Sequence, residues 1–381
     1  MKIAGDWLTR SGTRALCTAL EAAGHQALFV GGCVRNALLG APVADLDIAT
    51  DATPDQVSHI AAAARLKVVP TGIDHGTVTV IAGQIPHEVT TFRRDVETFG
   101  RHATVAFSDR IEEDAARRDF TMNALYARID GTVIDPLDGL PDLLARRVRF
   151  VGDATARINE DYLRILRFFR FHAWYGDPAN GPDPEALAAI AGGLDGLAHV
   201  SRERIGHEMR KLLAAPDPAP SLAAMQATGV LARILPGADA RVLAPLVHLE
   251  DGRPPRWQRR LAALGGPAPD LRLSRAESAA LDHIRRAMTL PLPEAAWRLG
   301  ADAATDAALI TAATLGQPLP ADTEATIAAA AAARFPVTAA DLLPSIQGAA
   351  LGATLKRLES RWIASGFALD RAALLANDQT D

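Results

Sequence analysis

The stretch LFVGGCVRNALLGAPVADLD, residues 28–47, decides the fold, because it reads as strand, glycine turn, helix and second strand. Gly31-Gly32 would let the backbone come close to a phosphate. The expected helix over 34–39 would then present its N–H groups and positive dipole end to that anion. Asp45 and Asp47 lie two residues apart, and residues i and i+2 of a strand point to the same face of a sheet.

Two carboxylates held on one face repel each other, and a divalent cation neutralises them best. Mg²⁺ favours one or two carboxylates together with substrate phosphates. Arg35 adds a fixed cation beside the turn, and the dinucleotide fingerprint Gly-x-Gly-x-x-Gly is absent. The alternative without a ligand is an ordinary turn followed by a solvated strand end. The combination within one strand–turn–helix–strand unit instead favours a metal–nucleotide site with Asp45 and Asp47 as metal ligands.

Bulk properties bound the class of protein. The length of 381 residues, 49% of them hydrophobic, predicts two or three domains. The net charge of −5 means that any nucleic acid would have to bind at local basic patches. Cys17 and Cys33 make neither a disulfide framework nor a zinc cluster. The N-terminus lacks the apolar segment of a signal peptide, and the longest apolar run, 327–333, is too short for a bilayer. We therefore expect a cytoplasmic protein without a membrane segment.

Residues 1–150 read as an α/β domain. Short apolar runs predict strands at 27–30, 46–49, 68–69, 78–81 and 89–92. Ala82-Gly83 and Asp130-Gly131 predict hairpin turns, and Thr53-Pro54 predicts the start of a helix that continues to about residue 65. The segment 93–108 is polar and lacks periodicity, so we expect a mobile loop there.

Helical periodicity takes over after about residue 150. One helix is predicted over 159–174 and another over 200–213, with Ser201 as its N-cap. A Pro-rich linker is predicted at 214–220. A final amphipathic helix is predicted from a stripe of apolar residues at helical spacing within 351–362. The predicted domains are a catalytic head at 1–150, a helical neck for base recognition at 151–215 and a helical RNA-binding region at 221–381.

A second constellation lies in Arg117–Ala124, after an acidic helix start. The structural alternative is a solvated charged segment. The functional interpretation is that Arg118 holds a triphosphate while Asp119 orients a guanidinium or the region of Asn123.

A third constellation, Glu160–Phe171, is more specific. Asp161 and Arg164 would be neighbours on a helix, with Arg167 one turn further along. A surface ion pair is the simple alternative. Base recognition is the functional alternative, because cytosine and adenine each place a ring-nitrogen acceptor beside an amine donor. An arginine can donate to the first and an aspartate can accept from the second, whereas uracil and guanine present the reverse pattern.

In these motifs the chain resembles the class II tRNA nucleotidyltransferases, the CCA-adding enzyme family that includes bacterial poly(A) polymerases. The matching motifs keep the family's order and are Gly31-Gly32-Cys33-Val34-Arg35, Asp45-Leu46-Asp47, Arg117–Ala124 and Glu160-Asp161-x-x-Arg164-x-x-Arg167. Asn36 departs from the family, which more often has aspartate there. The His-Asp pair of the phosphohydrolase domain attached to some members is absent from the sequence.

The resemblance implies a polymerase-β-like nucleotidyltransferase head, a small mixed β-sheet with helices, followed by an all-α neck, body and tail. It implies that Asp45 and Asp47 are catalytic and hold Mg²⁺. Gly32 and Arg35 would touch the triphosphate or ribose, and Arg118 would bind the nucleotide from the other side.

The resemblance also implies that Asp161 and Arg164 select the incoming base, supported by Arg167 and Arg170. The implied reaction adds C, C and A to the tRNA 3′ end from CTP and ATP, without a nucleic acid template. Glu88, expected at the start of a strand, is a candidate third carboxylate whose simple alternative is a solvated strand end.

Three functions remain open on the sequence alone. CCA addition is favoured over poly(A) synthesis because the C-terminal end is not strongly basic; addition of CC or A alone also stays open. A non-catalytic RNA-binding protein on the same scaffold is disfavoured by the intact Asp45, Asp47 and Arg118. The tRNA would bind through basic surfaces, with candidates at 146–149, 201–211 and 253–260.

Overall fold

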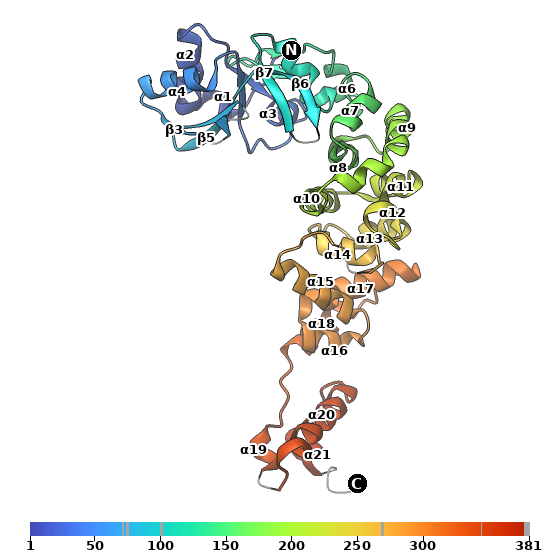
Figure 1. Ribbon diagram of the computed structural model, residues 1–381. Coiled ribbons are helices and arrows are strands. Elements are labelled where there is room, and N and C mark those ends of the chain that lie inside the picture. The colour runs from blue at the N-terminus through green and yellow to red at the C-terminus, as the bar shows by residue number, and fades with distance from the viewer. Residues whose placement is uncertain (71, 74–75, 100–101, 268–269, 344, 377–381) are drawn as a thin grey trace. The chain divides into compact units, whose positions relative to one another are not determined.

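A computed structural model describes residues 1–70, 72–73, 76–99, 102–267, 270–343 and 345–376 (Figure 1). The chain divides into two compact units, 1–212 with 220–234 and 213–219 with 235–381. Every described strand lies within the first 150 residues and the rest is helical, which confirms the predicted fold class. Among the described residues, no helix combines the length and apolarity needed to cross a bilayer.

A seven-stranded mixed sheet forms the centre of the N-terminal part. Its strands, in spatial order, are β3 (Lys67–Val69), β4 (Thr77–Ala82), β5 (Ile85–Thr91), β2 (Asp47–Thr50), β1 (Leu28–Val30), β8 (Tyr126–Ala127) and β9 (Val133–Ile134). The β2–β5 pair is parallel and the other pairs are antiparallel. The predicted hairpins are confirmed as β4–β5 and β8–β9. Gly83 and Gln84 both have positive φ, as a two-residue hairpin turn requires.

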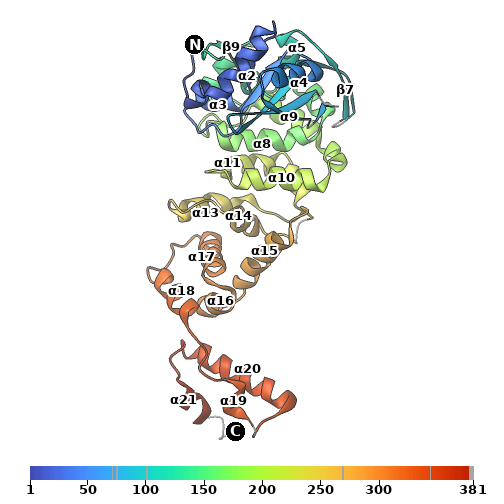
Figure 2. The same cartoon turned by 90° about the vertical axis from the view of Figure 1, so that its left-hand side faces the viewer.

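Helices cover this sheet and connect its strands. They are α1 (Asp6–Thr9), α2 (Ser11–Ala22), α3 (Gly32–Leu38), α4 (Pro54–Ala63), α5 (Ile111–Ala116), the 3-10 turn η2 (Thr121–Asn123) and α6 (Leu140–Leu144). Thr53 and Gln56 form a capping box that starts α4 where the sequence predicted. Figure 2 shows α2 and α4 side by side, and both pack on β4.

The helices of residues 151–234 complete the first unit. They are α7 (Ala154–Glu160), α8 (Leu163–Tyr175), α9 (Pro184–Gly192), the 3-10 helix η3 (Leu194–His199), α10 (Arg202–Leu213), α11 (Ala219–Ala227) and α12 (Val230–Ile234). Four phenylalanines join α8 to the head: Phe120 lies 5.0 Å from Phe150 and 4.9 Å from Phe171, and Phe150 stacks on Phe168, between ring centroids. These contacts fix the position of α8 relative to the sheet.

The second unit is entirely helical in its described residues. Its elements are η4 (Ala240–Val242), α13 (Leu243–Glu250), α14 (Trp257–Ala263), α15 (Arg275–Ala287), α16 (Leu292–Leu299), α17 (Ala301–Leu315), α18 (Thr323–Ala332), α19 (Ala339–Leu342), α20 (Gly348–Ala364) and α21 (Arg371–Ala376). The predicted final amphipathic helix is confirmed as α20, whose Leu358 and Trp362 are buried.

Four local predictions were wrong. The helix after the glycine turn begins at Gly32 rather than 34, and Asp45 lies outside β2. The helix predicted over 159–174 is interrupted at Asp161, whose backbone is extended. The segment 93–108 is not a structureless loop: β6 (Arg93–Phe99) and β7 (His102–Phe107) pair as a separate hairpin, apart from residues 100–101, which lie outside the described residues.

Candidate active site

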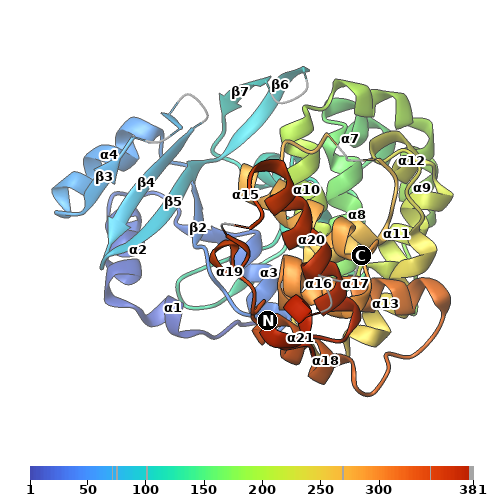
Figure 3. The same ribbon diagram turned by 90° about the horizontal axis from the view of Figure 1, so that it is seen from below.

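Asp47 opens β2, and its carboxylate has two acidic neighbours. Asp47 is the register partner of Glu88 in the parallel β2–β5 pair (Figure 3), and exposed Asp45 precedes it by two residues. Glu88 lies in the middle of β5, not at the start of a strand as predicted. Burial and the charge of Glu88 raise the pKa of the Asp47 carboxyl to about 6; Asp45 adds to this rise and Arg118 opposes it.

The chemistry of this donor set fits Mg²⁺. A half-buried carboxylate destabilised by burial and by a second carboxylate is relieved by a cation, and Mg²⁺ prefers one or two carboxylates with phosphate oxygens. Within the described ranges, no group of three or more His, Cys, Asp and Glu side chains is arranged to hold a metal ion. The assignment of Asp45 and Asp47 as metal ligands stays a prediction.

The glycine turn lies opposite Arg118. Gly31 has φ +70° and ψ −118°, a backbone conformation that side chains with a Cβ strongly disfavour. A Cβ at Gly31 would lie 3.5 Å from Arg118 Nη1, so this cation lies beside the turn. The buried thiol of Cys33 donates to Val30 O at 3.4 Å, and burial raises its pKa to about 11, which suits a small buried filler of the turn.

Asp114 holds Arg118 in this position. Arg118 donates to Asp114 Oδ2 at 2.9 Å and to Tyr126 Oη at 3.1 Å, while Tyr126 Oη donates to Asp114 Oδ2 at 2.7 Å. Burial opposes the charge of Asp114, but Arg118 and Arg117 outweigh it and lower the carboxyl pKa. Asp114 and Tyr126 were not among the predicted site residues. The spacing of Asp114 and Arg118, one helical turn, was the available signal.

Arg35 is buried and makes contacts within the protein. It donates to Asn123 Oδ1 at 2.5 Å and to Tyr175 Oη at 2.8 Å, and its guanidinium lies 4.0 Å from the Tyr175 ring centroid. Arg35 also donates to Asn36 Oδ1, while Asn36 Nδ2 donates to Pro42 O at 2.8 Å. The amide at position 36, where the family more often has aspartate, can thus accept and donate at once. The predicted contact of Arg35 with the nucleotide stays a prediction.

Asp119 connects the head to α8, as its predicted role of orienting a guanidinium requires. It accepts from Arg167 Nε at 2.8 Å and from Asn123 Nδ2 at 2.9 Å. Burial would raise the pKa of Asp119, but Arg167 and the hydrogen bonds lower it to about 2. Arg170 donates from Nε to Glu208 at 2.5 Å, and Arg167 lies 3.8 Å from the same carboxylate.

Asp161 and Arg164 flank the junction between α7 and α8 but engage different partners. Asp161 caps the end of α7 and accepts from both terminal nitrogens of Arg204, at 3.1 and 2.6 Å. Arg164 pairs with Glu160 and donates to Arg157 O at 2.8 Å. The structure therefore brings the two predicted base-reading residues to one junction without pairing them. Arg204 and Glu208 were not among the predicted site residues.

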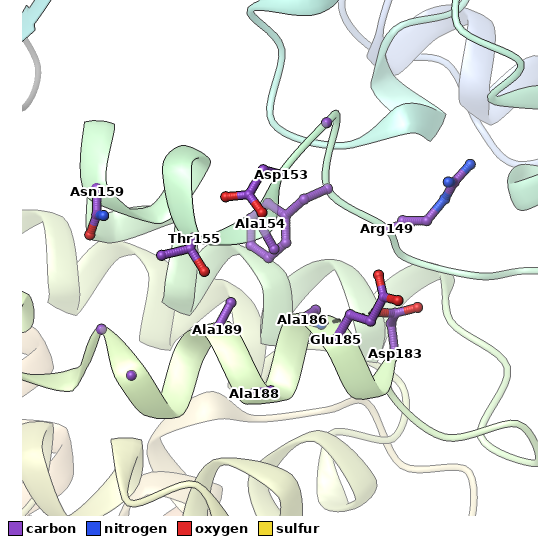
Figure 4. Close-up of a pocket in the computed structure, with 14 residues that line it drawn as sticks. Arg149, Asp153, Ala154, Thr155, Asn159, Asp183, Glu185, Ala186, Ala188 and Ala189 are labelled. Atoms are coloured by element: carbon purple, nitrogen blue, oxygen red, sulfur yellow. Dashed lines mark hydrogen bonds between the residues drawn. The ribbon is translucent and has the colours of Figure 1, made fainter.

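A pocket of about 640 Å³ lies elsewhere in the first unit, between α7 and α9 (Figure 4). Its polar lining side chains are Arg149, Asp153, Thr155, Asn159, Asp183 and Glu185. Asp153 and Asp183 already cap the helices α7 and α9 by accepting from backbone N–H groups. The described lining residues include none of the predicted site residues, so this pocket is separate from the carboxylates and Arg118.

Two family models match the chain. Residues 27–149 match the poly A polymerase head domain, and residues 182–241 match the model described as a probable RNA and SrmB-binding site of polymerase A. The first match covers Gly32, Asp45, Asp47 and Arg118.

Curated and solved relatives carry related names. Human mitochondrial CCA tRNA nucleotidyltransferase 1 is 42% identical over 207 residues, 54% of this chain and 48% of that protein. The CCA-adding enzyme of Geobacillus thermodenitrificans is 42% identical over 246 residues, 64% of this chain and 56% of that protein. The chain thus spans about half the length of the curated relatives it matches. The Bacillus stearothermophilus CCA-adding enzyme, solved in complex with CTP, has a TM-score of 0.72 at 28% identity over 97% of both chains.

Proposed function

We propose that the chain adds C, C and A to the 3′ end of tRNA from CTP and ATP, because it matches the poly A polymerase head-domain model and is similar to curated and solved CCA-adding enzymes. The supporting observation is that the Asp47 carboxylate lies within electrostatic reach of Glu88, Asp45 and Arg118, and that the Arg118 guanidinium lies beside the Gly31 turn. In this proposal the carboxylates hold a metal and the cation of Arg118 binds the triphosphate.

The proposed reaction is an in-line displacement at the α-phosphate. The 3′ hydroxyl of the RNA loses its proton to solvent as its oxygen forms a bond to the α-phosphorus, the bond to the bridging oxygen of the β-phosphate breaks, and pyrophosphate leaves. Arg118, fixed by Asp114 and Tyr126, binds and orients the triphosphate, so positioning and charge stabilisation supply most of the catalysis. Mg²⁺ held by Asp45 and Asp47 would activate the 3′ hydroxyl and neutralise the leaving pyrophosphate.

Base selection is proposed for the junction of α7 and α8. Asp161 would accept from the amine of cytosine or adenine and Arg164 would donate to the ring nitrogen, with Arg167 and Arg170 in support. Gly32 and Arg35 are proposed to contact the triphosphate or ribose. In this scheme residues 1–150 carry the chemistry, 151–215 read the base and 221–381 bind tRNA.

The test is incorporation of labelled nucleotides into tRNA that lacks its 3′ CCA, with Mg²⁺ present and CTP, ATP, UTP and GTP supplied singly and together. Ordered addition of C, C and A that then stops is expected. An open run of A on varied RNAs would support the alternative of a poly(A) polymerase, a name that the matching head-domain model carries. Addition of only CC or only A would identify a partial enzyme.

Asp47→Asn tests the carboxylate itself. Removing a metal ligand should cost several kcal/mol of transition-state stabilisation, which lowers kcat/KM for CTP by about a thousandfold or more. Asp51→Asn is the matched control, because Asp51 lies just beyond the other end of β2 and accepts from His25 and the Gln26 amide. Equal activity of wild type and Asp47→Asn would refute the proposed site.

A further inference from the structure

Arg204 reaches the predicted base-reading carboxylate from outside the recognised motifs. Its two terminal nitrogens donate to the two oxygens of Asp161, at 3.1 Å to Oδ1 and 2.6 Å to Oδ2. The backbone N–H of Leu163 donates to Oδ1 at 3.1 Å. A planar guanidinium that contacts both carboxylate oxygens fixes the plane of the carboxylate as well as its position.

The backbone at Asp161 makes this support necessary. Asp161 lies between two helices with φ −155° and ψ 105°, so neither helix fixes its side chain by regular geometry. Arg164 does not pair with it but donates to Glu160 and to backbone carbonyls. Arg204 therefore contacts the Asp161 carboxylate directly, while Arg167 acts on it through its charge.

The helix that carries Arg204 is itself firmly placed. Ile205, Met209 and Leu212 of α10 are buried in the core. Glu208, one turn after Arg204, pairs with Arg170 of α8 at 2.5 Å. Figure 2 shows α8 and α10 one beneath the other, and two successive turns of α10 thus contact the residues around the predicted base site.

We propose that Arg204 is a positioning residue for nucleotide selection: it holds the Asp161 carboxylate in the orientation that accepts from the amine of cytosine or adenine. Each carboxylate oxygen has two lone pairs. Arg204 and Leu163 occupy some of these, and the remainder face a limited set of directions toward a base. This inference rests on the proposed function and adds a specificity determinant outside the motif Glu160-Asp161-x-x-Arg164.

The experiment compares wild type, Arg204→Gln and Arg204→Lys on tRNA lacking its 3′ CCA. The readout is the ratio of kcat/KM for CTP over UTP, and for ATP over GTP. Arg204→Gln should reduce both ratios by roughly tenfold to a hundredfold, because a misplaced carboxylate costs the cognate base its partner and no longer excludes the others. Arg204→Lys keeps the charge but not the two-point contact, so its two ratios should lie between those of wild type and those of Arg204→Gln.

Arg233→Gln is the matched control, because it removes an exposed Arg–Asp pair with Asp195 in the same unit and should leave both ratios unchanged. Thermal unfolding checks that each variant is folded. If Arg204→Gln does not fold, Arg204→Lys and its ratios decide the question. Unchanged ratios in a folded Arg204 variant would overturn the role of Arg204 alone, whereas a wild type that incorporates neither C nor A would overturn the proposed function.

Discussion

Burial and neighbouring charge change the protonation of Asp47, the candidate metal ligand that opens β2. Its pKa of about 6 in the metal-free protein means that the folded state favours the protonated carboxyl. A raised carboxyl pKa stabilises the fold fully below the unfolded pKa near 4, and this contribution is lost as the pH rises through 6.

We therefore expect the metal-free wild type to lose roughly 2–3 kcal/mol of unfolding free energy relative to Asp47→Asn between pH 4 and pH 7. Urea unfolding of both proteins across this range, in the presence of a chelator, measures the difference. Mg²⁺ should reduce the loss at pH 7 because it binds the ionised carboxylate. Parallel stability curves for the two proteins would contradict the raised pKa.

The sequence motifs identified the candidate site residues but not the residues that position their side chains. Asp47, Arg118 and Asp119 stood out by spacing and type, and Asp119 does hold a guanidinium and Asn123. Tyr126 and Arg204 are common residue types whose roles depend on contacts across 8 and 43 positions of the chain. No local pattern encodes such contacts.

At the scale of elements, the β6–β7 hairpin shows where periodicity fails. The register between its strands shifts between Asp95 and Glu97. An irregularity of this kind disrupts the ladder locally, and it interrupts the two-residue period by which sequence patterns identify a strand. The capping box of α4 and the turn between β4 and β5 follow local rules, and those elements were predicted correctly.

The hairpin forms its own two-stranded sheet rather than extending the seven-stranded one. Such an isolated hairpin is marginally stable alone, and we therefore hypothesise that it moves in the switch from C to A addition. Replacing 95–105 with a short Gly-Ser turn should leave C addition intact and reduce A addition by about tenfold, a factor that corresponds to 1.4 kcal/mol. Single-nucleotide incorporation assays measure both steps, and unchanged addition of both bases would refute the idea.

For the molecule as a whole, one prediction from a run of basic residues was wrong in part. Residues 253–260 were a candidate RNA surface, yet Arg259 and Arg260 are buried. Arg259 donates to Asp306 Oδ1 at 3.1 Å and, like Arg260, pairs with Glu250. Local composition could not separate a basic surface from an internal ion-pair network, because the acids come from other helices.

Arg260 also organises the segment through which the chain passes between the two units. Residues 213–219 belong to the second unit, although the residues on both sides belong to the first. Arg260 donates to Leu213 O at 2.8 Å and to Pro216 O at 3.0 Å, and to Glu250 Oε2 at 2.6 Å. One buried side chain thus satisfies three carbonyls of this segment, those of Leu213, Ala215 and Pro216, and fixes it to α13 and α14.

Arg260→Met should destabilise the second unit by about 3–5 kcal/mol, since it leaves buried carbonyls unpaired and deprives Glu250 of a cation. Hydrogen exchange of the amides in α13 and α14, together with urea unfolding, measures this change. Arg241→Met, which removes an exposed pair with Asp239, is the control and should leave the exchange of these helices unchanged. If Arg260→Met exchanged as slowly as the control, the segment 213–219 would be held by the apolar packing of its neighbours, and its carbonyls would be satisfied without Arg260.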